Sequence, residues 1–382
     1  MYRSTARSRP LCFVLGVVVV SACMDVSGPP ARLPTWSFIA TSVHLTCGIA
    51  SDSVTYCWGS NGSGDLGNGS GIASVDRPTR IAGGLRFVSL TSGAESACGL
   101  TAAGVAYCWG NNTDGQLGDS SMSRRDTPVK VLGGLTFGTL VAGNGHTCGL
   151  TLGGIAYCWG DNIGGDLGDS SMASRVVPVP VAGGLTFTAL AAGDFHTCGL
   201  MSNGSAYCWG DNGYGQLGDT ATSSQHLTPV PVAGGLTFTS IVAGADHSCG
   251  VTSSGAAYCW GEGFSGALGD SSRGDQSLPV RVRGGLTFAA LSTSTFRTCG
   301  LTSTGTAYCW GYDALGDGTD TLHLTPVAVV GGLTFTTIST AYTHTCAITT
   351  TSVAYCWGYN SYGELGDGST TLRLTPVAVT HP

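Results

Sequence analysis

Short apolar runs alternate with glycine-rich turns along most of this chain, and residues 133–182 show the pattern in one complete unit. Runs of roughly four to eight residues that are rich in β-branched side chains and bounded by glycine are typical of strands. The runs of this unit span 135–142, 146–151, 155–159 and 178–181. Pro178 and Pro180 remove two backbone donors from the last run, so we expect it at the edge of a sheet.

The unit recurs seven times, and each copy contains the tetrapeptide Tyr-Cys-Trp-Gly at a pitch of 47 to 51 residues. A fixed period of this size indicates stacked supersecondary units that share a core. The repeats span approximately 35–82, 83–132, 133–182, 183–233, 234–283, 284–330 and 331–382. Four short antiparallel strands per repeat predict an all-β fold, a seven-bladed β-propeller. A linear β-solenoid is the alternative, although its repeats are usually shorter and parallel.

Each cysteine of the tetrapeptide follows another cysteine by ten residues. A hairpin folded at Gly153 would place Cys148 opposite Cys158, with Cα atoms about 4.5–5.5 Å apart, a separation that a disulfide accepts. Because the chain also begins like an exported protein, we expect seven disulfides within repeats. The expected pairs are Cys47–Cys57, Cys98–Cys108, Cys148–Cys158, Cys198–Cys208, Cys249–Cys259, Cys299–Cys309 and Cys346–Cys356.

The same hairpin register predicts the packing on the other side of the sheet. It places Tyr157 opposite Gly149 and Trp159 opposite Thr147. A large ring can cover exposed strand backbone at a glycine, so we expect the tyrosine to cover Gly149. We expect the tryptophan to pack between blades. The residue after the first cysteine is glycine in six repeats and Ala347 in the seventh, in agreement with this packing.

Residues 1–22 have the organisation of an export signal: three arginines, an apolar stretch too short to span a bilayer of roughly 30 Å, and small residues before Cys23. The sequence Val-Ser-Ala-Cys at 20–23 resembles a bacterial lipobox, in which the cysteine is lipidated; an ordinary secretory signal is the alternative. Residues 23–34 would form a flexible tether. We therefore predict an exported, membrane-anchored lipoprotein of a bacterial cell envelope, on its periplasmic or surface face.

Composition restricts the class of partner. Only 10% of the residues are charged, and cleavage before Cys23 would move the formal net charge from -7 to -10. A nucleic-acid binder needs a clustered basic surface, so we expect no nucleic acid and contact with the membrane through the lipid anchor only. The content of 42% hydrophobic residues and 61 glycines favours short strands and tight turns over disorder.

Two segments of the fourth repeat are informative. Residues 192–200 read Ala-Gly-Asp-Phe-His-Thr-Cys-Gly-Leu, and residues 207–219 read Tyr-Cys-Trp-Gly-Asp-Asn-Gly-Tyr-Gly-Gln-Leu-Gly-Asp. This pattern resembles the repeat of the regulator of chromosome condensation family, and it covers residues 35–380 in seven copies. The resemblance implies a seven-bladed propeller that binds proteins through loops on its faces. Paired cysteines and a lipobox depart from the founder of the family, which is a nucleotide exchange factor for a nuclear GTPase.

Residues with metal or catalytic potential have a structural interpretation. Histidine precedes the first cysteine by two residues at His146, His196, His247 and His344, but different blades would hold these histidines far apart, so we interpret them as hydrogen-bonding residues. The oxygen-rich loop 161–169 lacks the glycine and glutamate of an EF-hand, and Asx turns account for its residues. The sequence shows no nucleophile–base set and no phosphate loop. We expect no metal, no cofactor and no catalytic residue.

Binding residues are expected where the seven copies differ. The turn between the first two strands varies, and in a propeller these turns encircle the axis on one face. Its variable residues are Glu95, Asn144, Phe195, Asp246, Phe296 and Tyr342. The loops after the third strand add Tyr214, Phe264 and Tyr362, aromatic groups of the kind that anchors protein partners. The sixth copy lacks three residues of this loop, at 311–317, so we expect an asymmetric ring.

These features predict a non-enzymatic cell-envelope protein that binds an unknown protein ligand through a loop face. One alternative, implied by the family resemblance, is nucleotide exchange on a small GTPase. Another is an envelope hydrolase with its active site in the central channel. Such an enzyme would need two carboxylates about 5–10 Å apart.

Overall fold

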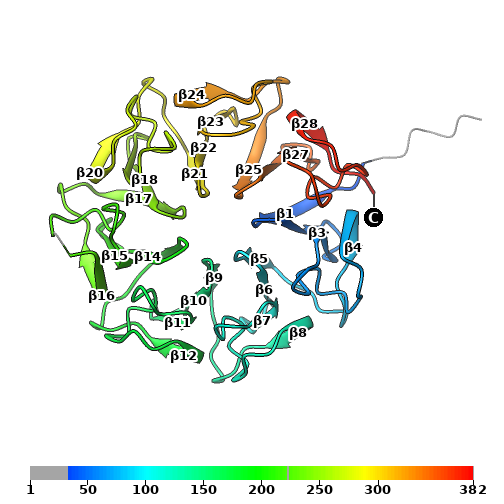
Figure 1. Ribbon diagram of the computed structural model, residues 1–382, viewed down its shortest axis with the longest axis horizontal. Helices are drawn as coiled ribbons and strands as arrows, with labels where there is room; N and C mark the ends of the chain where they lie inside the picture. The colour runs from blue at the N-terminus through cyan, green and yellow to red at the C-terminus, as the bar shows by residue number, and fades with distance from the viewer. Residues whose placement is uncertain (1–32, 222, 382) are drawn as a thin grey trace, which may run out of the picture. The chain divides into compact units, whose positions relative to one another are not determined.

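The computed structural model describes residues 33–221 and 223–381, which form seven four-stranded antiparallel sheets around a central axis (Figure 1). Each sheet consists of four strands that are consecutive in the chain, and the first strand of each lies nearest the axis. The described residues contain no helix. The prediction of an all-β, seven-bladed propeller is confirmed. The export signal and Cys23 lie outside the described residues.

The first four blades contain sixteen strands. Their bounds are β1 (Trp36–Thr41), β2 (Leu45–Ala50), β3 (Thr55–Ser60) and β4 (Ser74–Arg80); β5 (Ser89–Ser92), β6 (Ser96–Leu100), β7 (Ala106–Gly110) and β8 (Arg125–Lys130); β9 (Thr139–Ala142), β10 (His146–Leu150), β11 (Ala156–Gly160) and β12 (Arg175–Pro180); β13 (Ala189–Ala192), β14 (His196–Leu200), β15 (Ala206–Asp211) and β16 (Gln225–Pro231). As expected from its prolines, β12 lies at the outer edge of its sheet.

The last three blades continue the same order. Their bounds are β17 (Phe238–Ala243), β18 (His247–Thr252), β19 (Ala257–Gly261) and β20 (Gln276–Arg281); β21 (Ala290–Thr293), β22 (Arg297–Leu301), β23 (Ala307–Gly311) and β24 (His323–Ala328); β25 (Phe335–Thr340), β26 (His344–Thr349), β27 (Ala354–Gly358) and β28 (Arg373–Ala378). No helix of the described residues is long and apolar enough to cross a membrane.

The hairpin between the second and third strands has the predicted register. In the third blade Cys148 pairs with Cys158, Gly149 with Tyr157 and Thr147 with Trp159. All seven disulfides are present within repeats, with Cα atoms 4.0 to 4.1 Å apart. Each bond closes a short local hairpin, so it stabilises one blade without joining blades.

The prediction that Tyr157 covers Gly149 is wrong, because Phe137 takes that place. A Cβ on Gly149 would lie 2.5 Å from Cδ1 of Phe137. Residues 135–138 leave the sheet, and the backbone N–H of Phe137 donates to the carbonyl of Gly104 in the preceding blade at 2.8 Å. The strand therefore begins only at Thr139, and the phenylalanine ring folds back over the sheet. An alanine at Gly149 would clash with this ring, which explains why the position favours glycine.

The tryptophans pack between blades, as predicted. Trp159 of the third blade is fully buried in a cluster that contains Leu117, Cys98 and Cys108 of the second blade. Its Nε1 donates to the carbonyl of Gln116 in that blade at 2.9 Å. The core of the molecule therefore lies between neighbouring sheets, and each repeat buries its apolar surface against the next.

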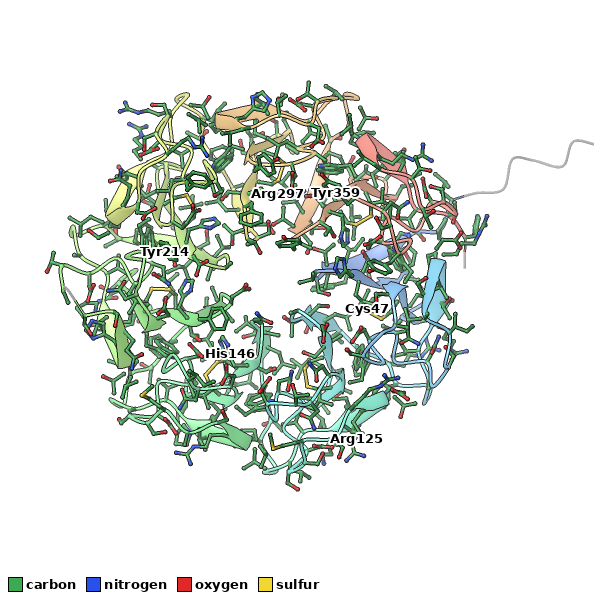
Figure 2. The ribbon with its side chains drawn as sticks, in the orientation of Figure 1. Cys47, Arg125, His146, Tyr214, Arg297 and Tyr359 are labelled. Carbon is green, nitrogen blue, oxygen red and sulfur yellow. A yellow bond between two sulfur atoms is a disulfide. The ribbon has the colours of Figure 1, made fainter. Side chains whose placement is uncertain are left out.

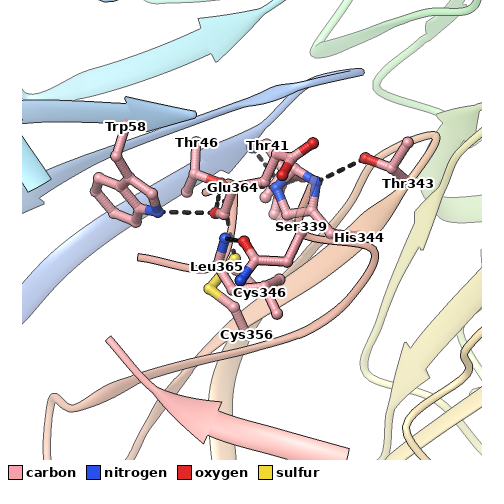
Figure 3. Close-up of a disulfide and its surroundings, with 11 residues drawn as sticks. Thr41, Thr46, Trp58, Ser339, Thr343, His344, Cys346, Cys356, Glu364 and Leu365 are labelled. Atoms are coloured by element: carbon pink, nitrogen blue, oxygen red, sulfur yellow. Dashed lines mark hydrogen bonds between the residues drawn. A yellow bond between two sulfur atoms is a disulfide. The ribbon is translucent and has the colours of Figure 1, made fainter. Parts of the chain in front are cut away.

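A chain of hydrogen bonds joins one blade to the next, and Figure 3 shows it where the seventh blade meets the first. The hydroxyl of Thr46 and Nε1 of Trp58 both donate to the carbonyl of Glu364, each at 2.8 Å. The Thr46 hydroxyl therefore accepts from Nε2–H of His344, 2.6 Å away. Burial lowers the pKa of His344 to about 4, so the imidazole is neutral near pH 7 and carries its proton on Nε2.

The same arrangement recurs at three other junctions, each with a histidine, a hydroxyl of the next blade and a shared carbonyl. The sets are His146, Thr197 and Asp166 O; His196, Ser248 and Gln216 O; and His247, Thr298 and Ala267 O. The histidines are hydrogen-bonding residues, as expected; each bonds the neighbouring blade, and Nδ1 of His344 also lies 3.2 Å from the hydroxyl of Thr343 in its own turn. The ring closes through contacts of this kind, together with the bond from Trp36 N to Ser352 O at 2.7 Å.

Candidate functional site

The strand ends form two different faces. We call the turn between the first and second strands of a blade its inner turn, and the loop between the third and fourth strands its outer loop. The first residue of each outer loop donates its backbone N–H to a carbonyl of the inner turn, as Asp211 does to Phe195 at 2.8 Å. Inner turns and outer loops therefore share one face, the loop face. The hairpins and the connections between blades form the opposite hairpin face.

Charge is concentrated on the loop face. Two arginines of its outer loops lie on it: Arg124 donates to the carbonyl of Gly62 at 2.7 Å, and Arg273 lies over the ring of Phe264. The inner turns and the first halves of the outer loops contain eleven of the 23 acidic residues of the chain. These acids are Asp65, Glu95, Asp114, Asp161, Asp166, Asp194, Asp211, Asp246, Glu262, Asp313 and Glu364. The segments of the hairpin face carry only Asp52, Arg86 and Arg283. The loop face is therefore the strongly acidic side of the propeller.

Exposed aromatic side chains lie on the same face. Phe195 is 42% exposed and Phe264 is 68% exposed, and Tyr214, Tyr342 and Tyr362 are exposed as well. Tyr312 and Tyr359, which the sequence analysis did not single out, add to this set. The loop residues and inner-turn residues meet directly, since the ring of Tyr362 lies 4.9 Å from that of His44. Aromatic groups at exposed positions are suited to anchoring a partner.

The structure distributes the remaining predicted binding residues around the axis. Glu95 is exposed and accepts hydrogen bonds from Ser63 Oγ at 3.0 Å and Asn111 Nδ2 at 3.2 Å. Asn144 and Asp246 are half-buried in their turns. Phe296 is half-buried against the ring of Tyr342, with ring centres 5.4 Å apart. These residues therefore form a ring of separate contacts and not one compact cluster.

Several carboxyl groups of the loop face have raised pKa values. Burial, followed by the charges of Asp161 and Asp211, raises the pKa of Asp166 to about 8. Burial and, to a smaller extent, the neighbouring Glu95 raise the pKa of Asp65 to about 7. Burial and like charges also raise the pKa values of Asp194 and Asp246 to about 6. Asp166 was not among the predicted binding residues; the second and fourth repeats have glutamine at its position.

The sixth blade breaks the pattern of the junctions. Arg297, labelled in Figure 2, replaces the histidine there, is fully buried, and donates from Nη2 to the carbonyl of Tyr342 at 3.1 Å. Burial lowers the pKa of Arg297 to about 10. Thr345 Oγ1 and Trp357 Nε1 have no hydrogen-bond partner among the described residues. Because the outer loop of this blade is three residues shorter, its backbone does not supply the carbonyl found at other junctions.

The oxygen-rich loop 161–169 is held by its own side chains. Asn162 Oδ1 accepts from the backbone of Leu167 at 3.0 Å, and its Nδ2 donates to Asp169 Oδ1 at 3.1 Å. Asp169 also pairs with Arg175 at 2.7 Å. Within 33–221 and 223–381, no group of three His, Cys, Asp or Glu side chains is placed to hold a metal ion. These contacts match the turn chemistry inferred for the loop.

The central channel is narrow and lined by small residues. The seven inner turns surround a cavity of about 100 Å³ in which Asp194 is the one carboxylate among the described lining residues. The hydrolase hypothesis requires two carboxylates that act together. The channel therefore lacks the pair of groups on which that hypothesis depends, within the part of the chain that the structure describes.

Seven consecutive four-stranded blades with an acidic, aromatic loop face define a seven-bladed β-propeller built from a tandem repeat. The family model for the RCC1-like domain matches residues 54–382, and the chain belongs to this family. Paired cysteines are present in all seven of its repeats. Disulfides in such number are typical of proteins that fold in an oxidising compartment.

Known proteins share the fold at low identity. The chain is 27% identical over 110 residues to the probable E3 ubiquitin-protein ligase HERC6 of Homo sapiens, a match that covers 27% of this chain and 11% of that protein. It superimposes on Prp20p from Saccharomyces cerevisiae with a TM-score of 0.77 at 20% identity, over 91% of this chain and 87% of that one. The chain superimposes on the ectodomain of the Physcomitrella patens receptor kinase CR4 with a TM-score of 0.55 at 26% identity, over 85% of this chain and 74% of that one. The likeness to Prp20p shows the fold alone.

Proposed function

We propose that this protein is exported, is anchored to a membrane of the cell envelope through a lipid on Cys23, and binds a protein partner through its loop face without catalysing a reaction. The observation that carries the proposal is the contrast between the two faces. One carries eleven acidic residues, of which Asp65, Asp166 and Glu364 are buried, together with two arginines and most of the exposed aromatic rings, and the segments of the other carry three charged residues. A surface with this combination of charge and aromatic anchors is suited to a specific protein interface.

Two further facts support the proposal. The structure of Prp20p was described together with its binding to Gsp1p and histones, so a propeller of this fold can present a face to protein partners. The seven disulfides favour an oxidising compartment, which would separate this protein from cytosolic and nuclear GTPases. Binding to an envelope protein therefore fits the chain better than nucleotide exchange.

Partner capture from envelope extracts tests the binding face. The oxidised protein should retain a partner that the variant Phe195→Ala/Phe296→Ala/Tyr342→Ala loses. A variant of the hairpin face, Leu152→Ser/Ile155→Ser, changes two side chains that are 90% and 46% exposed and should retain the partner. Loss of the partner by the hairpin-face variant alone would assign binding to the other side of the propeller.

The anchor is tested separately by fractionation. The wild-type protein should sediment with membranes and label with a radioactive fatty acid, whereas Cys23→Ser should be exported and soluble. A Cys23→Ser protein that still sediments with membranes would contradict lipid anchoring. It would not bear on the hypothesis that the loop face binds the partner.

A further inference from the structure

Each outer loop contains a Leu-Gly pair, and the residue just before this pair differs among the seven blades. The residues there are Asp65, Gln116, Asp166, Gln216, Ala267, Ala314 and Glu364. The longer side chains reach back into their own loops, since Gln116 Oε1 accepts from the backbone of Asp114 at 3.0 Å and Gln216 Oε1 from that of Tyr214 at 2.9 Å. Asp166 is shorter by one methylene. Neither of its carboxyl oxygens has a hydrogen-bond partner among the described residues, although the side chain is fully buried.

Asp166 lies directly beneath the loop face where the third blade meets the fourth. A Cβ on Gly164 would be 2.8 Å from its Oδ1, and a Cβ on Gly210 would be 3.1 Å from the same atom. The same Cβ on Gly164 would also lie 3.4 Å from the carbonyl oxygen of Phe195. Backbone without side chains therefore separates this carboxyl group from the surface, between the loops that begin with Asp161 and Asp211.

The surrounding groups add negative charge and no positive charge. Asp161 and Asp211 both act on Asp166, and Asp246 stands beside Asp211. Asp114 faces Asp161 across Gly145. The nearby His146 is neutral because burial lowers its pKa to about 4. None of the ion pairs within the described ranges involves these carboxylates.

The junction of the seventh and first blades shows what this position can hold. Glu364 is the equivalent of Asp166, and its Oε1 lies 3.4 Å from Nδ1 of His44 in the neighbouring inner turn. The ring of Tyr362 lies against the same imidazole. At the junction of the third and fourth blades Phe195 stands where His44 would be. This junction therefore keeps the buried acid but has no basic side chain beside it.

We infer that the junction of the third and fourth blades receives one cationic side chain of the protein partner, an ammonium or a guanidinium, between Asp161 and Asp211 and above Asp166. The inference rests on the proposed function and names the chemistry of the partner at this position. The exposed ring of Phe195 provides an apolar and aromatic wall for the stem and the charge of a lysine or arginine. A side chain is favoured over a metal ion because no set of three ligands is assembled within 33–221 and 223–381.

Binding at this position should release a proton. The pKa of Asp166 is about 8, so its carboxyl group is mostly protonated near neutral pH. A cation above it favours the ionised form and lowers that pKa. The neutral carboxyl group then becomes a carboxylate, the partner keeps its positive charge, and one proton passes to the solvent.

Calorimetry with decalysine as the probe tests the inference. Titrations in buffers of different ionisation enthalpy give the number of protons released. We expect the wild-type protein to release about one proton per bound probe near pH 7, with affinity that rises about a hundredfold between pH 6 and pH 9. Asp166→Asn should release about one proton fewer near pH 7, and its affinity should change much less over the range, because only groups with pKa values of about 6 to 7 remain. Acetylated decalysine, which lacks the charges, should not bind.

Charge-matched variants separate a specific position from general attraction. Asp161→Asn/Asp211→Asn should weaken decalysine binding about tenfold, whereas Glu95→Gln/Glu262→Gln removes two charges elsewhere on the same face and should weaken it about twofold. Equal weakening by both pairs, or proton release that is as large in Asp166→Asn as in the wild type, would overturn the inference. Proton release of the same size on titration with calcium chloride would assign the position to a metal. If the aromatic triple variant loses the captured partner while Asp161→Asn/Asp211→Asn keeps it, partner binding by the loop face is supported and the cation position at the junction is refuted.

Discussion

Asparagine at Asp166 should stabilise the folded protein, and the gain should depend on pH. The substitution keeps the size of the side chain and removes the ionisation. The folded-state pKa of about 8 lies above the value of 3.8 for an unperturbed carboxyl group. The folded protein therefore holds a proton that the unfolded chain has released between these two values. Stability from this group is fully present below pH 3.8 and is lost as the pH rises to about 8.

The magnitude follows from the width of that interval. Each pH unit within the interval lowers the free energy of unfolding by about 1.4 kcal/mol. An interval of about four units therefore lowers it by roughly 5 kcal/mol, as an upper limit. For a folded unit of about 350 residues, 1 kcal/mol corresponds to about 1.4 °C in Tm. We expect Asp166→Asn to equal the wild type near pH 4 and to melt roughly 6 °C higher near pH 8.

Differential scanning calorimetry of the oxidised proteins at the two pH values measures the effect. Asp169, three residues further along the same loop, provides a control of opposite sign. Burial raises the pKa of Asp169, but hydrogen bonds from Ser171 and Arg175 outweigh it and lower the pKa overall. Asp169→Asn should therefore destabilise the protein near pH 8 and have less effect as the pH falls towards 3. An Asp166→Asn protein with the same Tm as the wild type at both pH values would refute the reasoning.

Three further predictions concern the scaffold. Replacing Cys148 and Cys158 by alanine should cost roughly 2–3 kcal/mol and leave the β-sheet circular dichroism intact, because one bond closes one ten-residue hairpin; a global loss of structure would contradict a local role. Burial lowers the pKa of His247 from 6.5 to about 4, so its stabilising contribution is present above pH 6.5 and is lost towards pH 4; the Tm difference between wild type and His247→Gln should shrink over that interval. Trp159→Phe should cost about 1 kcal/mol more than Trp357→Phe in urea unfolding, because Trp159 loses a hydrogen bond to Gln116 whereas Trp357 has no partner within the described residues; equal costs would show that these bonds do not stabilise the junctions.

The pattern of residues that lie close together in the sequence determined the repeat, the strands and the disulfides. Residues 148 and 158 are symmetric about a glycine turn, so an antiparallel hairpin must place their cysteines opposite each other. The sevenfold recurrence of the same hairpin then required neighbouring repeats to stack, because one blade leaves its tryptophan without cover, and four antiparallel strands per repeat favoured a propeller over a solenoid. These conclusions need only residues within about fifty positions of each other, and the structure contains each of these features.

Contacts between blades were decided by the tertiary structure. The sequence placed Tyr157 opposite Gly149 correctly, yet the chain entering the blade brings Phe137 over that glycine. Asp161, Asp166 and Asp211 come together only because two outer loops meet at a junction. Phe137 and Gly149 belong to one repeat, but the course of the chain before the strand decides their contact, whereas Asp211 meets Asp161 and Asp166 from a different repeat, so no spacing within a single repeat encodes that site. The repeat sequence therefore determined the blades, and the packing of the ring determined which side chains share a site.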